Sequence, residues 1–452
     1  MRILVVGCGK IGRAILSSLI GEGHDVVAVD DDPRVIEEIT NIYDAMGVCG
    51  SGTDCVTLSE AGVEKCELFV AVTGSDEFNM LACFLARRMG AAHTIARIRN
   101  PEYNENSLGF LSRELDISFP INPERLTAQE IYHILKLPGA ATVEAFSGNS
   151  FEMVELILRD VSPLIGLNLA EIRKKFPAKF LICAVEREDS VYIPDGRFEL
   201  KKGDKIALTA APDELTKLLR MLGILKKQSR SVMIVGANRT AYYLAKTLLR
   251  SGMSVKVIDK DRTRCEEFGS AVPGAVVICG DGAEQELLLE EGIRTTDAFV
   301  ALTGLDEENI LISFFAASQQ VAKVVSKVNR SELGSMAEKL GLDCLVSPQN
   351  IISGVLARYA RALHNSIGSN VETLYKVMDG KAEALEFNVR ADFPGVGVPL
   401  RKLTLKPNLL IAGIIRGRKT VIPSGDDAIA AGDKVIVLAT EHRLNDLADI
   451  IR

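Results

Sequence analysis

The sequence repeats itself at a nearly constant offset, and this duplication limits what the chain can fold into. The matched segments, all 229 or 230 residues apart, are Gly7 with Gly236, Asp30 with Asp259, Thr73–Glu77 with Thr303–Glu307, and Gly203–Lys205 with Gly432–Lys434. Chance would not keep the register over four blocks, so the chain is two copies of one unit. We expect the boundary between the copies in the polar segment Lys226–Ser231.

Short apolar runs alternate with segments of helical periodicity in the first part of each copy. The runs expected as strands are Ile3–Val6, Val26–Val29, Met46–Cys49, Leu68–Val72, Thr94–Ile98 and Ile117–Ile121. The expected helices are Ile11–Ile20, Pro33–Tyr43, Cys55–Ala61, Asn79–Met89 and Pro123–Leu135, the last ending before a turn at Pro138-Gly139. Apolar strands separated by helices are typical of a parallel sheet that is covered on both faces. We therefore predict an α/β fold with a Rossmann-like, doubly wound domain.

A small α+β lobe is expected after each sheet domain. Its strands in the first copy are Phe151–Leu158, Phe180–Val185, Val191–Ile193 and Lys205–Thr209, with helices at Leu169–Lys175 and Asp213–Met221. In the second copy the strands are Glu383–Val389, Leu409–Ile415, Thr420–Ile422 and Lys434–Leu438, with a closing helix at Arg443–Ile451. The predicted domains are large, small, large and small, at residues 1–140, 141–228, 229–364 and 365–452.

A glycine motif follows the first predicted strand. Gly7-Cys8-Gly9-Lys10-Ile11-Gly12 fits Gly-x-Gly-x-x-Gly at the head of a helix, and Asp30 ends the next strand. This context is typical of a dinucleotide site, in which the glycines allow a tight turn, let the pyrophosphate approach the backbone and pack the helix on the strand. Asp30 would accept hydrogen bonds from the ribose, and the acidic run Asp30–Asp32 would repel a 2′-phosphate. The sequence therefore predicts NAD(H) in the first half.

Further candidate residues lie where the other predicted strands end. Thr73 and Gly74 follow the fourth strand, at the edge where open parallel sheets bind ligands. Thr53 and Asp54, after the third strand, and Arg97, at the fifth, are weaker candidates, because each could also be a helix cap or a solvated charge.

The second copy has lost part of the glycine motif. Gly236-Ala237-Asn238-Arg239-Thr240-Ala241 keeps the first glycine alone, and a side chain at Asn238 should crowd a pyrophosphate on the loop. Asp259 is present, and Arg239 stands where the first copy has Lys10. We expect a weaker or different adenine-nucleotide site here, with a purely structural domain as the alternative.

Composition argues against several other functions. A net charge of -7 provides no basic surface for a nucleic acid. The nine cysteines include no Cys-x-x-Cys pair, and no His lies at ligand spacing from a Cys, so reduced, mostly buried cysteines and no metal site are expected. No apolar run is long enough to span a membrane, and Met1–Gly7 leads into the glycine motif without a secretory signal. We expect a cytoplasmic protein.

No set of catalytic residues is apparent. The five histidines are scattered, and neither a Walker loop nor a Gly-x-Ser-x-Gly elbow is present. A dehydrogenase would need an acid or base beside the nicotinamide and groups that hold a substrate. The sequence therefore predicts a binding protein rather than an enzyme.

The residues also match a known family along essentially the whole chain. The marks are Gly7–Gly12 with Asp30, Ala71–Met80, Ile95–Arg99, Pro163–Gly166 and Gly203–Lys205, with Pro394–Gly397 and Gly432–Lys434 in the second copy. By these marks the chain resembles the bacterial TrkA-type potassium uptake regulators, which consist of tandem RCK (KTN) domains, each a TrkA-N lobe followed by a TrkA-C lobe.

The resemblance implies a regulator bound peripherally at the inner face of the membrane. It implies a homo-oligomer, a dimer or a tetrameric ring, under a TrkH-type or TrkG-type potassium channel, gated when a nucleotide changes its shape. The implied cofactor residues are Gly7 through Gly12, Asp30, Thr73, Gly74 and Arg97 in the first half, and Gly236, Arg239, Asp259, Thr303, Gly304 and Lys327 in the second. The ligand implied for the second half is ATP or ADP, or NAD(H) again.

The same resemblance implies that Pro123–Leu135 and Pro348–Leu363 are crossover or hinge helices, with simple packing helices as the alternative. Two other functions stay open from the residues: a soluble NAD-dependent oxidoreductase, and a nucleotide-sensing regulator of another cation transporter or of a transcriptional target.

Overall fold

The computed structural model describes residues 1–103, 105–136, 142–146, 151–158, 162–223, 229–342, 344–365, 371–378, 380–417, 419–440, 444 and 446–452. The expected turn at Pro138-Gly139 and the first part of the expected boundary, residues 226–228, lie outside them. The chain divides into two compact units, Met1–Gln129 with Ser347–Ala360, and Glu130–Val346 with Arg361–Arg452. Among the described residues, no helix is both long and apolar enough to span a bilayer.

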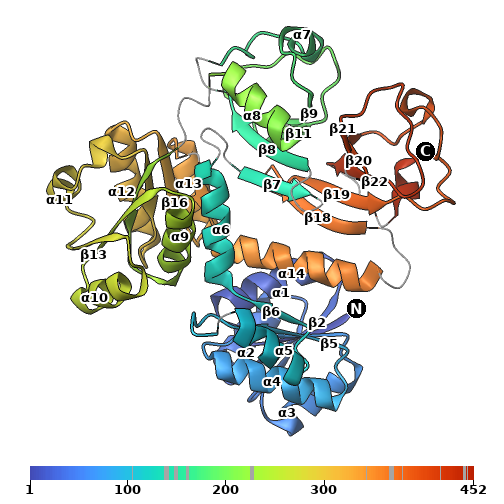
Figure 1. Ribbon diagram of the computed structural model, residues 1–452. Coiled ribbons are helices and arrows are strands. Elements are labelled where there is room, and N and C mark those ends of the chain that lie inside the picture. The colour runs from blue at the N-terminus through green and yellow to red at the C-terminus, as the bar shows by residue number, and fades with distance from the viewer. Residues whose placement is uncertain are drawn as a thin grey trace. The chain divides into compact units, whose positions relative to one another are not determined.

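The first unit contains a six-stranded parallel sheet with the order β3-β2-β1-β4-β5-β6. The sheet lies in the domain drawn in blue and teal in Figure 1. Its strands are β1 (Arg2–Val6), β2 (Asp25–Asp30), β3 (Met46–Cys49), β4 (Leu68–Ala71), β5 (His93–Arg97) and β6 (Phe119–Ile121). The helices are α1 (Lys10–Gly21), α2 (Pro33–Ile42), α3 (Cys55–Glu60), α4 (Asp76–Met89) and α5 (Glu105–Glu114), with a 3₁₀ turn at Val63–Lys65. The strand order reverses between β1 and β4, and open parallel sheets commonly bind ligands at the carboxyl ends of the strands beside such a point.

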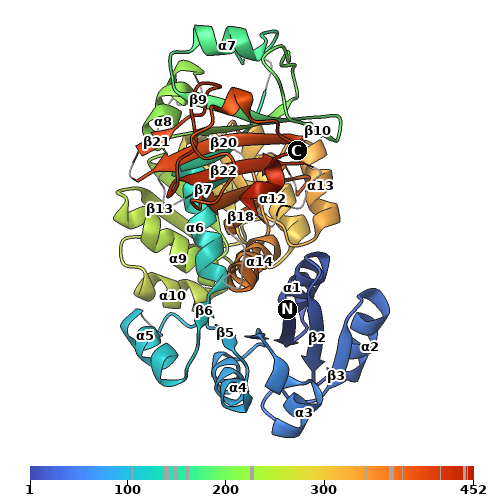
Figure 2. The ribbon, with the colours of Figure 1, turned by 90° about the vertical axis from the view of Figure 1, so that its right-hand side faces the viewer.

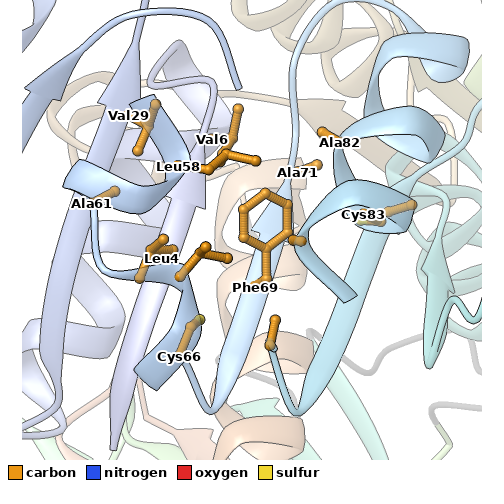
Figure 3. Packing of buried hydrophobic residues seen from close by; sticks show 14 of the residues in the cluster. Leu4, Val6, Val29, Leu58, Ala61, Cys66, Phe69, Ala71, Ala82 and Cys83 are labelled. Carbon is orange, nitrogen blue, oxygen red and sulfur yellow. The ribbon is translucent and has the colours of Figure 1, made fainter. Parts of the chain in front are cut away.

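The core of this domain explains why the apolar runs form a buried parallel sheet. All four residues of β4 are buried, as expected for a strand that is covered on both faces. Phe69 is fully buried and lies between Leu4 and Leu58 on one side and Cys83 of α4 on the other (Figure 3). Burying a side chain of this size contributes roughly 2–3 kcal/mol.

The two predicted crossover helices each pack on the sheet domain of the other copy. Helix α14 (Pro348–Asn365) follows the second sheet, yet the ring of Tyr359 stacks on Phe119 of β6, with 5.4 Å between centroids and 15° between planes. Helix α6 (Pro123–Lys136) follows the first sheet, yet the Tyr132 hydroxyl lies 2.9 Å from Ser251 Oγ at the end of the helix after β12. The crossover is therefore present, whereas the hinge role stays a prediction.

The second unit contains the second parallel sheet, with the matching order β14-β13-β12-β15-β16-β17. Its strands are β12 (Ser231–Val235), β13 (Ser254–Asp259), β14 (Val276–Cys279), β15 (Ala298–Ala301), β16 (Lys323–Lys327) and β17 (Leu345–Val346). The helices are α9 (Arg239–Arg250), α10 (Arg262–Ala271), α11 (Gln285–Glu290), α12 (Asp306–Ser318) and α13 (Ser331–Lys339), with a 3₁₀ turn at Ile293–Thr295.

Two five-stranded antiparallel sheets form the small lobes, in the orders β10-β9-β11-β8-β7 and β18-β19-β22-β20-β21. The first lobe has β7 (Thr142–Phe146), β8 (Phe151–Ile157), β9 (Phe180–Arg187), β10 (Ser190–Tyr192), β11 (Lys205–Ala210), α7 (Leu169–Lys175) and α8 (Pro212–Met221). The second has β18 (Val371–Val377), β19 (Ala382–Asn388), β20 (Leu409–Arg416), β21 (Lys419–Val421) and β22 (Lys434–Ala439), with 3₁₀ turns at Leu400–Lys402 and Leu447–Ile450. Strands β7 and β18 were not predicted.

The two lobe sheets pack face to face (Figure 1 and Figure 2). Their shared core contains Phe146, Phe151 and Met153 from the first lobe and Ala384, Ile436 and Leu438 from the second. Polar contacts cross it as well: Glu155 Oε1 accepts the Met378 N–H at 2.7 Å, and the Thr209 hydroxyl donates to the Ala412 carbonyl at 2.9 Å.

The second lobe departs from the predicted repeat of the first. The predicted closing helix Arg443–Ile451 is wrong: the described residues there form one 3₁₀ turn, capped by Asp446 and beginning at Leu447. In the first lobe, Asn168 and Glu171 form a capping box that starts α7. In the second lobe Pro399 takes the place of Asn168, and a single 3₁₀ turn replaces the helix, since proline has no such cap to offer.

Candidate functional site

The glycine loop of the first half leaves one end of α1 open. Gly7 has φ +89°, and a Cβ there would lie 2.8 Å from the Thr73 nitrogen. A Cβ on Gly12 would lie 2.1 Å from the Gly7 carbonyl oxygen, so loop and helix are in close contact. Gly9 is different: nothing lies within 4 Å of a Cβ built there, and no side chain caps the helix. The first N–H groups of α1, which begins at the exposed Lys10, therefore remain available to an anion.

Asp30 holds the glycine loop through its carboxylate. Oδ2 accepts the Cys8 N–H at 2.7 Å, and Oδ1 accepts the Asp32 N–H at 3.1 Å. Each oxygen keeps a further lone pair, which a ribose hydroxyl could use. The Cys8 side chain is itself in the core, where burial and then the Asp30 charge raise the pKa of its thiol to about 12. Cys8 therefore contributes its backbone to the loop rather than a side chain to a ligand.

The rim formed by Thr73, Gly74 and Arg97 is held by a residue that sequence reasoning missed. Asn79 is fully buried in α4, and its Oδ1 accepts from both the N–H and the hydroxyl of Thr73, at 2.8 and 2.7 Å. Its Nδ2 donates to the Arg97 carbonyl at 2.9 Å. The end of β4 is thus tied to the end of β5. The repeat of Thr73–Asn79 as 303–309 was the signal that could have revealed it.

Arg97 faces a second residue that was not predicted, Glu124 in the first turn of α6. The guanidinium Nη2 lies 3.5 Å from Glu124 Oε1, and Nη1 donates to the Thr73 carbonyl at 3.4 Å. Arg97 Nε and Glu124 Oε2 are buried without a hydrogen-bond partner. Burial lowers the pKa of Arg97, although the Glu124 charge opposes this shift. The ion pair between Arg97 and Glu124 is therefore long, and it lies at the carboxyl edge of the sheet.

Thr53 and Asp54 lie in the turn after β3, at the carboxyl edge of the same sheet. A Cβ on the neighbouring Gly52 would lie 2.2 Å from Val6 Cγ1 at the end of β1. The Asp54 carboxylate caps α3, accepting from the N–H and hydroxyl of Thr57 at 3.0 and 2.8 Å, and these hydrogen bonds lower its pKa. Asp54 is thus a helix cap, which was the alternative to a ligand contact. The Thr53 hydroxyl lies 3.0 Å from Ser51 Oγ.

In the second half, a side chain covers the helix end that is open in the first. Gly236 keeps a positive φ of +107°. Asn238 takes the place of Gly9, its Oδ1 accepting the Ala241 N–H at 3.1 Å and its Nδ2 donating to the Leu302 carbonyl. The Asn238 carboxamide therefore occupies the start of α9, where a pyrophosphate would bind. Ala241, in the place of Gly12, is fully buried.

Asp259, the counterpart of Asp30, makes the same backbone hydrogen bonds and also has an arginine near its carboxylate. Asp259 accepts the N–H groups of Ala237 and Asp261 at 2.8 and 2.9 Å, as Asp30 does in the first half. Arg264 Nε donates to Asp261 Oδ2 at 3.1 Å, and its Nη1 lies 3.5 Å from the Asp259 carboxylate. In the first half Arg34 pairs with Asp32 in the same way as Arg264 does with Asp261. Arg264 was not among the predicted residues.

The remaining predicted residues of the second half lie along the same edge. Asn309 accepts the Thr303 N–H at 2.8 Å and donates to the Lys327 carbonyl at 2.9 Å, repeating the role of Asn79. Arg239 is exposed at the first position of α9, and a Cβ on Gly304 would meet nothing within 4 Å. All six predicted residues thus lie at the carboxyl edge of the second sheet.

Comparison with known proteins agrees with this duplicated architecture. The model of the TrkA-N domain matches residues 3–110 and 232–348, and that of the TrkA-C domain matches residues 153–223 and 384–452. The Trk system potassium uptake protein TrkA homolog of Archaeoglobus fulgidus is 31% identical over the full length of both chains. The Trk system potassium uptake protein TrkA of Vibrio alginolyticus is 30% identical over 98% of this chain and 96% of that protein.

Solved structures share the fold at low sequence identity. The GsuK channel bound to NAD superposes with a TM-score of 0.63 at 18% identity, over 97% of this chain and 77% of that one. GsuK bound to ADP superposes with a TM-score of 0.52 at 16% identity, over 81% and 69%. Both full-length relatives are Trk system potassium uptake proteins, as the resemblance in the sequence implied. With both domain types present twice and full-length relatives of this identity, the chain belongs to the TrkA family of potassium uptake proteins.

Proposed function

We propose that this protein is the nucleotide-binding regulatory subunit of a Trk-type potassium channel, lying at the cytoplasmic face of the membrane as a homo-oligomer. One observation carries the nucleotide part of the proposal: the uncapped start of α1 lies beside the Asp30 carboxylate, whereas Asn238 closes the start of α9. An open helix N-terminus next to a ribose acceptor suits a dinucleotide. Family membership supports the potassium part.

The first half would bind NAD(H) along the crevice edge. The loop Gly7–Gly12 would hold the pyrophosphate, with Gly9 leaving room for it, and Asp30 the ribose. Thr73, Gly74 and Arg97 would form the rim, with Thr53 beside them and Asp54 acting through the turn that it caps. The boundaries proposed for the domain that carries this site are residues 1–140, followed by the lobe 141–228, and 229–364 with 365–452 for the second copy.

The second half would bind an adenine nucleotide whose phosphates do not rest on the start of α9. Asp259 would hold the ribose, with Gly236 in the turn beneath it. The cations Arg239 and Lys327 would face the phosphates, and Thr303 and Gly304 the rim. ADP or ATP fits this arrangement better than NAD(H), because Asn238 occupies the place of a pyrophosphate. GsuK, which shares the fold, has been solved with NAD and with ADP.

Gating would follow from a difference in affinity. A ligand shifts a conformational equilibrium only as far as it prefers one state over the other. Helix α6 begins at Pro123, with only Asn122 between it and the end of β6, and it carries Glu124, the partner of Arg97, in its first turn. A nucleotide that changes the Arg97 contact would therefore act on α6, and α6 and α14 would serve as the hinges.

The direct test is calorimetric titration of NADH, NAD⁺, ADP and ATP into the purified protein and into Asp30→Ala and Asp259→Ala. We expect Asp30→Ala to lose NADH binding and to keep ADP binding, and Asp259→Ala to do the reverse. Loss of both ligands in both variants would indicate a single shared site. No binding of any of the four nucleotides to the unsubstituted protein would overturn the ligand-gated function.

The Glu124→Gln substitution tests the Arg97 contact. We expect NADH affinity to rise about 3- to 10-fold, because the ligand phosphates no longer compete with a carboxylate for the guanidinium, and roughly 1 kcal/mol is typical of a partly buried charge contact. Adenosine, which carries no phosphate, serves as the control and should bind the two proteins equally. A fall in NADH affinity would show that Glu124 supports the ligand instead of competing with it.

A further inference from the structure

We propose that Cys265 and Cys279 form a reversible disulfide beside Asp259, which makes the second sheet domain responsive to hydroperoxides. The part of the proposal that concerns ligand affinity rests on the proposed function of the second half. The formation of the disulfide does not depend on it.

The fold brings the two thiols together beside the ribose acceptor. Cys265 lies in α10, with its Sγ 3.2 Å from the Asp259 carbonyl oxygen and 3.7 Å from that of Ile278. Cys279 is the last residue of β14 and pairs with Asp259 in the parallel ladder of β13 and β14. The Cys265 sulfur therefore lies against the backbone of Ile278, the residue before Cys279, and of Asp259, the ladder partner of Cys279.

The two thiols differ in exposure, and this difference gives them different roles in the reaction. Cys279 is exposed, so a peroxide can reach it, whereas Cys265 is 7% exposed. Burial raises the pKa of Cys265 to about 11, and the charge of Cys279 and a hydrogen bond with its side chain add to this. At neutral pH Cys265 is therefore a protonated thiol beside Cys279, so the exposed Cys279 reacts first, and Cys265 reacts in the second step as it gives up its proton.

The first half provides a natural comparison. Cys49 occupies the place of Cys279, is exposed, and pairs with Asp30 across β2 and β3. The place of Cys265, however, is taken by Ile36, which is buried in α2. The exposed thiol is thus present in both halves, and its partner in the second alone.

The reaction balances with a hydroperoxide as the oxidant. The Cys279 sulfur attacks the peroxide, an S–O bond forms as the O–O bond breaks, and an alcohol, or water from H₂O₂, leaves. The Cys265 sulfur then attacks the sulfur of the sulfenic acid, and an S–S bond forms as the S–O bond breaks. The Cys265 thiol proton passes to the departing oxygen, which leaves as water. Two thiols lose two electrons and two protons in total, and a dithiol reductant reverses the change.

The disulfide would act on the ligand site through Asp259. Forming it removes the thiol that now contacts the Asp259 carbonyl and pulls α10 toward β14. Helix α10 begins after Asp261 and carries Arg264, and both contact the ribose-acceptor region. We expect the oxidised protein to bind ADP about 10-fold more weakly in its second half, while NADH binding in the first half stays unchanged.

The experiment treats the full-length protein with H₂O₂, blocks free thiols and maps peptides by mass spectrometry. A 265–279 cross-link that dithiothreitol removes is expected in the unsubstituted protein and in Cys49→Ser, and not in Cys265→Ser or Cys279→Ser. In Cys265→Ser, Cys279 should instead accumulate as sulfenic and sulfinic acid. ADP and NADH titrations of the reduced and oxidised proteins complete the set.

Each result decides a separate part of the proposal. Absence of the cross-link, or an equal yield of any cross-link through Cys49, would overturn the thiol pair. A cross-link with unchanged ADP affinity would overturn its effect on the site. If the reduced protein binds no ADP, the proposed function of the second half fails, and the peptide map still decides whether the disulfide forms.

Discussion

The Gly9→Asn substitution is expected to weaken NADH binding at least about 100-fold, or nearly 3 kcal/mol, while the protein stays folded. It copies Asn238 into the first half, where the side chain would cap α1 and occupy the place of the pyrophosphate. Nothing lies within 4 Å of a Cβ at Gly9, whose φ of -66° suits any residue, so the fold should accept it. A cap should if anything stabilise α1 by a few tenths of a kcal/mol. Titration calorimetry and thermal unfolding measure the two effects.

Gly21→Ala is the matched control at the other end of α1. A Cβ there also meets nothing within 4 Å, so NADH binding should not change. The reciprocal Asn238→Gly should remove the cap of α9 and open that helix end to phosphate. If Gly9→Asn bound NADH as the unsubstituted protein does, the start of α1 would not be where the pyrophosphate lies.

Glu155→Ala is expected to lower the free energy of unfolding by about 3 kcal/mol, because it removes the acceptor of a buried N–H group and one member of a largely buried ion pair. The Glu155 side chain is 5% exposed; it pairs with Lys205 at 3.1 Å and accepts the Met378 N–H from the second lobe. The substitution thus removes the acceptor of the buried Met378 N–H and takes one carboxylate away from the partly buried Lys205 ammonium. Urea unfolding, followed by circular dichroism, gives the value.

Lys381→Ala is the control for this second prediction. Lys381 also joins the lobes, through Glu186 and Asp189, but it is 36% exposed. An exposed ion pair contributes less than about 1 kcal/mol. Similar losses in the two variants would mean that the lobe interface depends on its charges in general rather than on the buried Glu155.

Local sequence signals were sufficient for most of the fold. Every strand predicted in the first sheet domain and the two lobes corresponds to a strand of the structure, because a strand such as Leu68–Ala71, which is buried on both faces, needs a short unbroken apolar run. Helix α5 and strands β7 and β18 were missed. Helix α5 contains Ser107 and Gly109, whose helix propensity is low. Strands β7 and β18 lie at sheet edges, where pairing with β8 and β19 defines them.

The candidate site shows the same division. Gly7, Gly9, Gly12 and Asp30 were predicted because their spacing along one strand, turn and helix has a direct physical reason. Asn79, Glu124 and Arg264 were missed because each acts through a contact with a residue 5 to 27 positions away, which is set by how helices dock on the sheet.

By itself, the sequence determined that this protein is a duplication of a Rossmann-like domain and a small lobe, with an intact glycine motif in one copy. Those features depend on short-range periodicity and on residue types that are required at fixed positions. The tertiary structure alone decided that α6 and α14 each pack on the sheet domain of the other copy and that the two lobe sheets share one core. These contacts join segments far apart in the chain, and what selects them is the complementary shape and burial of folded surfaces rather than any local pattern.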